Sequence, residues 1–244
     1  MKIYCISDIH GHWDNFRRFI DTLEKDDVVY VLGDVIDKGT EPIKCLKYIM
    51  NDPRFTMILG NHEYMMYQYL STEIPYEQEE LYVQWVMCNS GRDTLVEYRK
   101  LDEKGQDEIL NFIKDLPLNI PNLKVGERIY YLVHSSPHSY EKLRMEDVGF
   151  DDDVIVSYVW DRVNPMDRIA IKDQVVVAGH TFVQEYLGYY DVEVKPVFSY
   201  KKNYGLAPDI KNTNYIDIDG GLAADLPNSK LIALCLDDLT FKVY

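Results

Sequence analysis

Short apolar runs that stop at a glycine or a polar residue recur in the first part of the chain. Three of them are KIYCIS (2–7), DVVYVLG (27–33) and FTMILG (55–60). Each is rich in β-branched or other apolar residues, which is typical of a buried strand. The segments 12–26 and 40–52 separate these runs and carry apolar residues at helical spacing, with Pro42 suited to a first helical turn. This order predicts a β-α-β-α-β unit with parallel strands and right-handed crossovers.

The pattern then changes twice along the chain. Residues 62–115 have mostly helical patterning, and strand-like runs return afterwards at 129–134, 175–180, 214–219 and 230–236, before the closing FKVY. We therefore expect an α/β protein with two sheets, the second more antiparallel, in a single domain over 1–244. The Tyr- and Lys-rich segment 185–214 fits either a long functional loop or a hairpin that covers a sheet edge.

Five of these apolar runs end in, or are followed by, an Asp, Asn or His residue. These residues are Asp8 and His10, Asp34, Asn61 and His62, His134, and His180. In an open α/β sheet, ligands bind outside the carboxyl ends of the strands. A lone Asp or His after a strand is usually a turn, cap or core residue. Five strand ends that carry Asp, Asn or His are hard to explain as five independent turn, cap or core residues. We therefore expect these side chains to share one crevice.

This set of side chains has the chemistry of a metal centre. Oxygen ligands mixed with imidazoles suit Mn, Fe or Zn better than Ca, and the lack of thiolates argues against a structural zinc site. Six candidate donors exceed what one open catalytic metal needs. A site with two divalent ions about 3.5–4 Å apart, bridged by a carboxylate, uses them all and can clamp a phosphoryl group.

Composition excludes some partners. The formal net charge of −15 argues against a general nucleic-acid binder, although bound metals or a few cations can still attract an anionic substrate. No stretch approaches the about 18 apolar residues of a membrane span. The first apolar run is broken by Asp8, so we expect no signal peptide and a cytoplasmic protein without membrane attachment. Nothing in the pattern indicates an oligomeric state.

Several blocks together resemble a known family. They are SDIHG (7–11), GDVIDKG (33–39), GNHE (60–63), VH (133–134) and GH (179–180), with the weaker WDR (160–162) and YIDIDGG (215–221). This set is similar to the calcineurin-like metallophosphoesterases, and within them to the PPP serine/threonine phosphatases of bacterial and phage (lambda phosphatase-like) type. The resemblance implies two mixed β-sheets packed in a sandwich flanked by helices.

The resemblance also implies roles for individual residues. Asp8, His10 and Asp34 would hold a first metal, with Asp34 bridging, and Asn61, His134 and His180 would complete the second. His62 would be the general acid, oriented by Asp37, which would raise the pKa of the imidazole. Arg162 would bind phosphate oxygens, and Asn61 could also touch them. Lys38 occupies the position of a family arginine, so it would hold phosphate as a point charge.

The function implied is hydrolysis of phosphomonoesters through attack by a metal-bridged hydroxide, with Mn the favoured metal and Fe or Zn the alternatives. A serine/threonine protein phosphatase acting on a phosphoprotein is the first expectation. The alternative is a symmetrical bis(5'-nucleosyl)-tetraphosphatase or another nucleotide phosphatase that acts on a small phosphorylated substrate. A non-catalytic metal-binding scaffold and a nuclease are the less favoured readings. Asp219 would add a negative charge near the metals if its side chain points inward.

Overall fold

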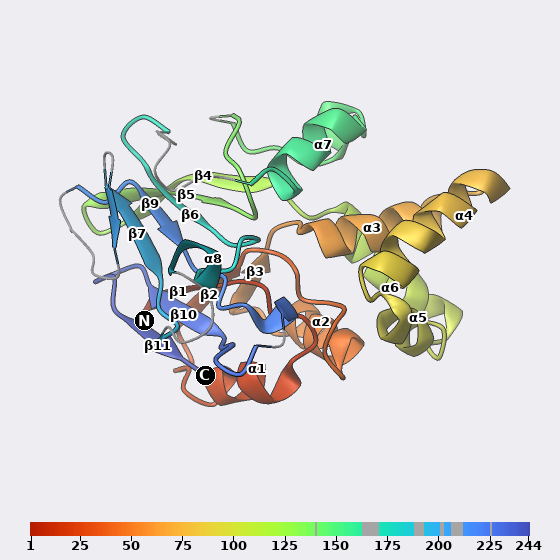
Figure 1. Ribbon diagram of the computed structural model, residues 1–244, viewed down its shortest axis with the longest axis horizontal. Coiled ribbons are helices and arrows are strands. Elements are labelled where there is room, and N and C mark those ends of the chain that lie inside the picture. Colours follow the sequence, from red (N-terminus) through yellow and green to blue (C-terminus); the bar gives the residue numbers. More distant parts are fainter. Residues whose placement is uncertain (140, 163–170, 188–192, 201–202, 206–211, 225) are drawn as a thin grey trace.

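The first sheet has five strands and carries the predicted β-α-β-α-β unit (Figure 1). The structure is a computed structural model that describes residues 1–139, 141–162, 171–187, 193–200, 203–205, 212–224 and 226–244. The strand order is β11-β10-β1-β2-β3. The strands are β1 (Ile3–Ile6), β2 (Val28–Val31), β3 (Phe55–Met57), β10 (Ile232–Cys235) and β11 (Phe241–Val243). β1 pairs in parallel with β2, and β2 with β3, as predicted.

The second sheet has six described strands in the order β4-β5-β6-β9-β7-β8. They are β4 (Asn119–Val125), β5 (Arg128–Val133), β6 (Val175–Ala178), β7 (Val197–Tyr200), β8 (Asn203–Gly205) and β9 (Tyr215–Asp217). Three of its five pairings are antiparallel, which confirms the expected mixed character. β7 and β8 form a hairpin at the edge of this sheet. Within its described residues, segment 185–214 therefore has the hairpin structure, the second of the two alternatives.

The two sheets pack face to face. Alternate residues of their strands form one apolar layer between them, for example Cys5 of β1, Leu132 of β5 and Ile216 of β9. In β5 the intervening residues point the other way, because successive side chains of a strand face opposite sides of the sheet. Tyr131 and Val133 thus join the cluster that includes Tyr158 of α7. The predicted sandwich of two mixed sheets is confirmed.

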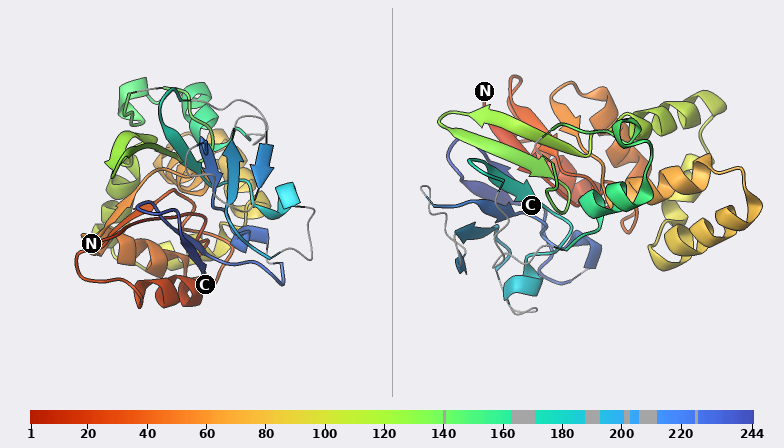
Figure 2. Two further views of the ribbon diagram at one scale, coloured as in Figure 1. Left: turned by 90° about the vertical axis from the view of Figure 1, so that its left-hand side faces the viewer. Right: turned by 90° about the horizontal axis from the view of Figure 1, so that it is seen from above.

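Helices cover the outer faces and extend the molecule at one end. They are α1 (Trp13–Ile20), α2 (Pro42–Asn51), α3 (Asn61–Ser71), α4 (Pro75–Tyr82), a π-helix (Val83–Cys88), α5 (Arg92–Tyr98), α6 (Glu103–Lys114), α7 (Asp152–Val159) and the short α8 (Gln184–Leu187). Figures 1 and 2 show α3 to α6 grouped beyond the end of the sheets. No helix among the described residues is long and apolar enough to cross a membrane.

Candidate metal centre and active site

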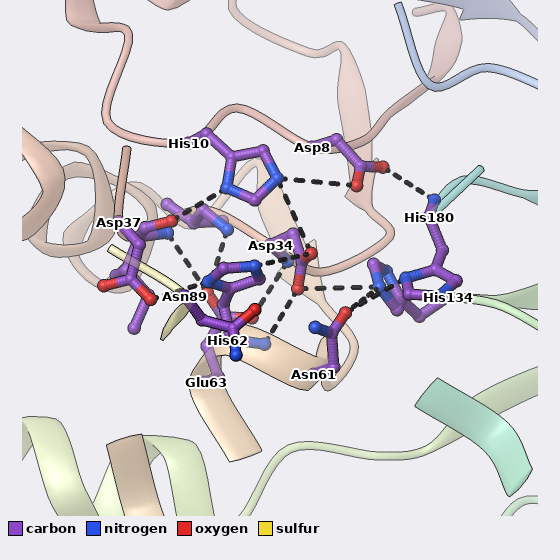
Figure 3. A network of polar contacts seen from close by, with 12 residues as sticks. Asp8, His10, Asp34, Asp37, Asn61, His62, Glu63, Asn89, His134 and His180 are labelled. Carbon is purple, nitrogen blue, oxygen red and sulfur yellow. Dashed lines mark hydrogen bonds and ion pairs between the residues drawn. The ribbon is translucent and has the colours of Figure 1, made fainter. Parts of the chain in front are cut away.

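The polar residues at the strand ends meet in one crevice, as expected (Figure 3). A pocket of about 210 Å³ opens there. Of the residues named from the sequence, it is lined by Asp8, His10, Asp34, Lys38, Asn61, His62, Arg162, His180 and Asp219. His134 and Asp37 lie directly behind this lining and contact Asp34 and His62 respectively. The sequence-based prediction of a shared site is therefore matched by the geometry.

The backbone is strained where it delivers these side chains. Asp8, His10, Asp34 and His180 have φ of 52°, 46°, 54° and 68°, in the left-handed region that non-glycine residues rarely adopt. Such conformations concentrate at functional sites, where the surrounding structure over-determines them. At each of these positions the strained turn directs the side chain into the crevice.

Asp34 lies at the centre of the crevice. Its Oδ2 is 3.6 Å from His10 Nε2, and its Oδ1 is 3.5 Å from His134 Nε2. Two groups of potential metal ligands share this carboxylate, one containing His10 and His62 and the other containing His134 and His180. Gly60 makes room for it, because a Cβ there would lie 2.3 Å from Asp34 Oδ1. Asp34 thus has the position of a bridging ligand.

Asp8 borders the first of these groups. Its Oδ1 is 3.8 Å from His10 Nε2, while its Oδ2 accepts hydrogen bonds from the Ser7 hydroxyl and from the His180 backbone N–H. Burial acts to raise the pKa of this carboxyl, but the contacts with His10, His134 and Ser7 outweigh it and lower the pKa to about 2. Asp8 is therefore a carboxylate at neutral pH.

Backbone carbonyls fix the ring orientation of the imidazoles. His134 Nδ1 donates to Leu32 O at 2.6 Å, and His180 Nε2 donates to Trp160 O at 3.2 Å. The remaining nitrogen of each ring carries a lone pair, and both face Asn61 Oδ1, at 3.0 Å and 3.1 Å. Atoms that each lie about 2.1 Å from one cation are separated by about this much. The donor set fits a divalent cation between these three residues.

The protonation states of these side chains also fit bound divalent cations. Burial lowers the pKa of His134, and it lowers that of His180 to about 3, so both rings are neutral and can act as ligands. Burial, together with the carboxylates of Asp8 and Glu63, raises the pKa of Asp34 well above its usual range. Carboxylates crowded in this way are stabilised by cations, so the site as a whole fits two divalent ions.

His62 and Asp37 form a buried pair beside this centre. His62 Nδ1 lies 2.6 Å from Asp37 Oδ2, which matches the expected contact. Asp37 acts to raise the pKa of His62, as expected, but it does not set the net value. Burial is the largest influence and lowers the pKa of His62 to about 4, although Asp37 acts in the opposite direction. The neutral ring is protonated on Nδ1 and presents Nε2 toward Asp34, 3.9 Å away.

Two cationic side chains lie at the rim of the pocket. Lys38 is exposed, and Arg162 is 55% exposed. Arg162 Nη1 donates to Glu185 Oε1 of α8 at 3.1 Å, a contact that the sequence did not suggest. Asp219 points into the pocket and is only 2% exposed, which answers the question left open by the sequence. The rim therefore mixes cations with additional carboxylates.

Sequence reasoning missed four further residues. Glu63 is fully buried and accepts hydrogen bonds from the backbone N–H groups of residues 34, 35 and 36, which fixes the loop that carries Asp34. Trp85 and Thr94 both donate to Asp37, and Asn89 lines the pocket. Glu63 stands inside GNHE and could have been singled out. Trp85 lies in the π-helix, Asn89 directly after it and Thr94 on α5, and only the fold brings these three residues to the site.

A family model described as calcineurin-like phosphoesterase matches residues 1–184. The chain belongs to this family. Similar curated proteins are named symmetrical bis(5'-nucleosyl)-tetraphosphatase. That of Delftia acidovorans is 33% identical over 122 residues, which is 48% of this chain and 38% of that protein. One from Buchnera aphidicola is 34% identical over 67 residues, 26% of this chain and 24% of that protein. The alignments thus span well under half of these relatives.

Several solved structures share the fold of this chain. A metallophosphoesterase from Sphaerobacter thermophilus superimposes with a TM-score of 0.59 at 16% identity, over 100% of this chain and 88% of that one. A protein serine/threonine phosphatase from Saccharomyces cerevisiae gives a TM-score of 0.55 at 11% identity, over 100% and 79%. At these identities the likeness concerns architecture, and the substrate has to be argued from the site.

Proposed function

We propose that the protein is a metal-dependent phosphoesterase. The observation that carries this proposal is the position of Asp34. Its Oδ2 faces His10 and His62, its Oδ1 faces His134, and His62 is in turn bound to Asp37. In this proposal Asp8, His10 and Asp34 hold one divalent ion, and Asp34, Asn61, His134 and His180 hold the other. Mn²⁺ is the favoured ion, with Fe or Zn as alternatives. Such a pair of ions, when bound, neutralises phosphoryl oxygens and activates a water nucleophile.

The protein's own groups do the remaining work in this mechanism. In this proposal Lys38 and Arg162, which line the pocket, attract the phosphate, and Asn61, which also lines it, touches one of the phosphate oxygens. For His62 to act as the acid, Nε2 of the neutral ring must first take up a proton, and Asp37, which holds the Nδ1 proton, stabilises the resulting imidazolium. Nε2 then gives this proton to the leaving oxygen and the ring returns to its neutral form. Leaving groups that are strong bases need that proton most, so His62 matters most for alkyl phosphates.

The proposed substrate is a nucleotide polyphosphate, such as a symmetrical dinucleoside tetraphosphate. The named relatives favour it, and Trp160 and Phe182 line the pocket as aromatic surfaces on which a base could stack. The second candidate is a phosphoserine or phosphothreonine residue of a protein. It is supported by the exposure of Lys38 and Arg162 at an accessible rim.

Metal content and substrate release test the proposal together. We expect about two metal ions per chain and Mn²⁺-stimulated release of phosphate or nucleotide. Diadenosine tetraphosphate should be compared with a panel of phosphopeptides at equal concentration. Faster turnover of the dinucleotide supports the first substrate, and faster turnover of the peptides supports the second. Two bound metals with no hydrolysis of any ester would contradict the proposal and favour the metal-binding scaffold.

His62→Asn separates the acid from the metal ligands. Because His62 Nε2 is also near Asp34, it belongs geometrically to one of the two ligand groups. In our assignment the variant keeps both metals and loses about 10²–10⁴-fold in kcat on an alkyl phosphate, with a smaller loss on para-nitrophenyl phosphate. Loss of one metal from the variant would instead make His62 a ligand.

A further inference from the structure

Asp37 is held from three sides by side chains. It is fully buried, and its Oδ2 accepts hydrogen bonds from His62 Nδ1 at 2.6 Å and from Trp85 Nε1 at 2.8 Å. Its Oδ1 accepts from the Thr94 hydroxyl at 2.5 Å, and the same hydroxyl oxygen accepts the Asp37 backbone N–H at 3.0 Å. Both carboxylate oxygens are therefore fixed, and rotation of the carboxylate would break at least two bonds.

Trp85 is itself locked in place. It is fully buried in the π-helix, a wide-turn form that occurs often at functional sites. Its indole ring packs against Tyr69 of α3, with ring centroids 5.6 Å apart. Gly91 closes the other side, because a Cβ there would lie 2.5 Å from Trp85 Nε1 and Cε2. The Nε1–H group can thus point only toward Asp37.

Thr94 approaches from a different element. It lies on α5, is fully buried, and has no exposed surface with which to bind solvent. Its hydroxyl contacts two atoms of one residue, the carboxylate and the backbone of Asp37. Asp37 has a left-handed backbone with φ of 69°, so this contact also supports a strained conformation.

We propose that Trp85 and Thr94 are positioning residues that set the reactivity of His62 through Asp37. This inference rests on the proposed function. With Oδ1 occupied by Thr94 and one side of Oδ2 by Trp85, the remaining direction of Oδ2 faces His62 Nδ1. The ring is thereby held with Nε2 toward the pocket. The π-helix and α5 thus contribute to the chemistry, although, unlike α3, they carry none of the proposed metal ligands.

Removal of each donor without loss of bulk tests this role. Trp85→Phe removes the indole N–H, and Thr94→Val removes the hydroxyl at nearly constant shape. We expect kcat on an alkyl phosphate to fall about 10–100-fold with KM unchanged. Losses of this size are typical when a residue that orients a functional side chain through a hydrogen bond is removed. Turnover of para-nitrophenyl phosphate, which has a good leaving group, should change much less. Thr94→Ser retains the hydroxyl and should restore activity on the alkyl ester.

A double-variant cycle shows whether the effect passes through His62. In a His62→Asn background, Trp85→Phe and Thr94→Val should have almost no further effect on the alkyl phosphate, because residues that act as a unit are not additive. Tyr130→Phe is the matched control, since it removes a buried hydrogen bond to Leu236 O between the sheets and should not discriminate between the two esters. Equal losses on both esters, or full additivity with His62→Asn, would overturn the proposal.

An NMR measurement of the His62 Nδ1 proton tests the positioning role without relying on hydrolysis of an ester. In protein labelled with ¹⁵N-histidine and loaded with Zn²⁺, the His62 Nδ1 proton should give a downfield resonance, assigned by its loss in His62→Asn. Trp85→Phe and Thr94→Val should shift or broaden it while the thermal unfolding transition stays cooperative, and Tyr130→Phe should leave it in place. An unchanged resonance in both variants would refute the positioning role, even in a protein that hydrolyses no ester.

Discussion

In the proposed function, the lysine at position 38 would limit how the pocket can hold a phosphate. An ammonium is a point charge, whereas a guanidinium can donate two parallel hydrogen bonds to phosphate oxygens. Lys38→Arg should therefore lower KM for para-nitrophenyl phosphate several-fold, with little change in kcat. Steady-state kinetics would measure this effect. Lys104→Arg on α6 is the control, because that side chain is 83% exposed and does not line the pocket. An unchanged or higher KM would contradict a role of residue 38 in binding phosphate.

In the proposed function, Arg162 would exchange one anion for another when substrate binds. Its Nη1 already donates to Glu185, so an incoming phosphate competes with a carboxylate of the same chain. Exposed ion pairs of this kind contribute roughly 0.2–1 kcal/mol, so Glu185→Gln should lower KM by up to about fivefold. Inhibition by inorganic phosphate should strengthen in parallel. Glu193→Gln makes the same charge change in a residue that pairs with Lys195 outside the pocket, and an equal effect there would indicate a general field effect.

At the scale of elements, one ion pair ties the end of α2 to the start of β3. Arg54 donates to both oxygens of Asp52, with Nη2 2.7 Å from Oδ2 and Nε 3.1 Å from Oδ1. This contact is the main reason that the pKa of Asp52 is lowered. A carboxyl with a lowered pKa stabilises the folded state above its unfolded pKa of about 3.9, and this stability is lost as pH falls through the folded value.

Arg54→Met should therefore destabilise the protein by about 1 kcal/mol at pH 7. The difference from the wild type should shrink as the pH falls below about 4. Urea unfolding at a series of pH values measures it. Arg17→Met is the reference, because Arg17 is 65% exposed and lies 3.9 Å from Asp21, so its loss should have no measurable effect. A constant difference down to pH 2 would mean that Arg54 acts through packing of its side chain.

Regular patterns explain which elements were predictable. The parallel strands β1, β2 and β3 are short apolar runs with helices between them, and they were all predicted. β4 was missed because Pro121, Asn122 and Lys124 interrupt its apolar pattern, and the structure has a register shift between Ile120 and Leu123. β7 and β8 lie in the tyrosine-rich segment 185–214, whose many turn-forming residues hide a strand pattern. β7 is paired on both sides and its Val197 and Phe198 are fully buried, whereas β8 is the edge strand. Such edges follow from tertiary pairing, which local sequence does not encode.

At the scale of the whole molecule, one carboxylate links the two halves of the site. Asp34 ends a strand of the first sheet, and its Oδ1 faces His134 from the second. We expect Asp34→Asn to abolish loading with two metals and all metal-dependent hydrolysis. Metal analysis after dialysis against Mn²⁺ would check this, and retention of two ions per chain would contradict the bridging role.

The same substitution should change stability in opposite directions with and without metal. The pKa of Asp34 is raised by burial and by nearby carboxylates, so its ionised form destabilises the fold when no cation is bound. Metal-free Asp34→Asn should therefore have a Tm equal to or above that of the metal-free wild type. Mn²⁺ should raise the Tm of the wild type by binding the folded state, and should raise that of the variant less. A variant less stable than the wild type after chelation would refute this explanation.

Some features of the site could be predicted from the sequence, and others could not. The proposed ligands and His62 stand in short blocks at strand ends, so strand order alone predicts that they meet, whereas Asp37 was expected only from the family resemblance. The net pKa of His62 and the Arg162–Glu185 pair depend on burial and on side-chain packing across distant segments. Trp85 and Thr94 carry no local signal, since a tryptophan or threonine on a helix is ordinary until the fold places it against Asp37.

The indole of Trp85 also gives the molecule an internal optical probe. Indole fluorescence is sensitive to hydrogen bonding and to nearby protonated groups, and this ring donates to the carboxylate that also holds His62. Of the three tryptophans, Trp13 lies on α1 and Trp160 lines the pocket, so single-tryptophan proteins would isolate each signal. Emission from Trp85 alone should then follow the state of the imidazole during turnover, without any attached dye.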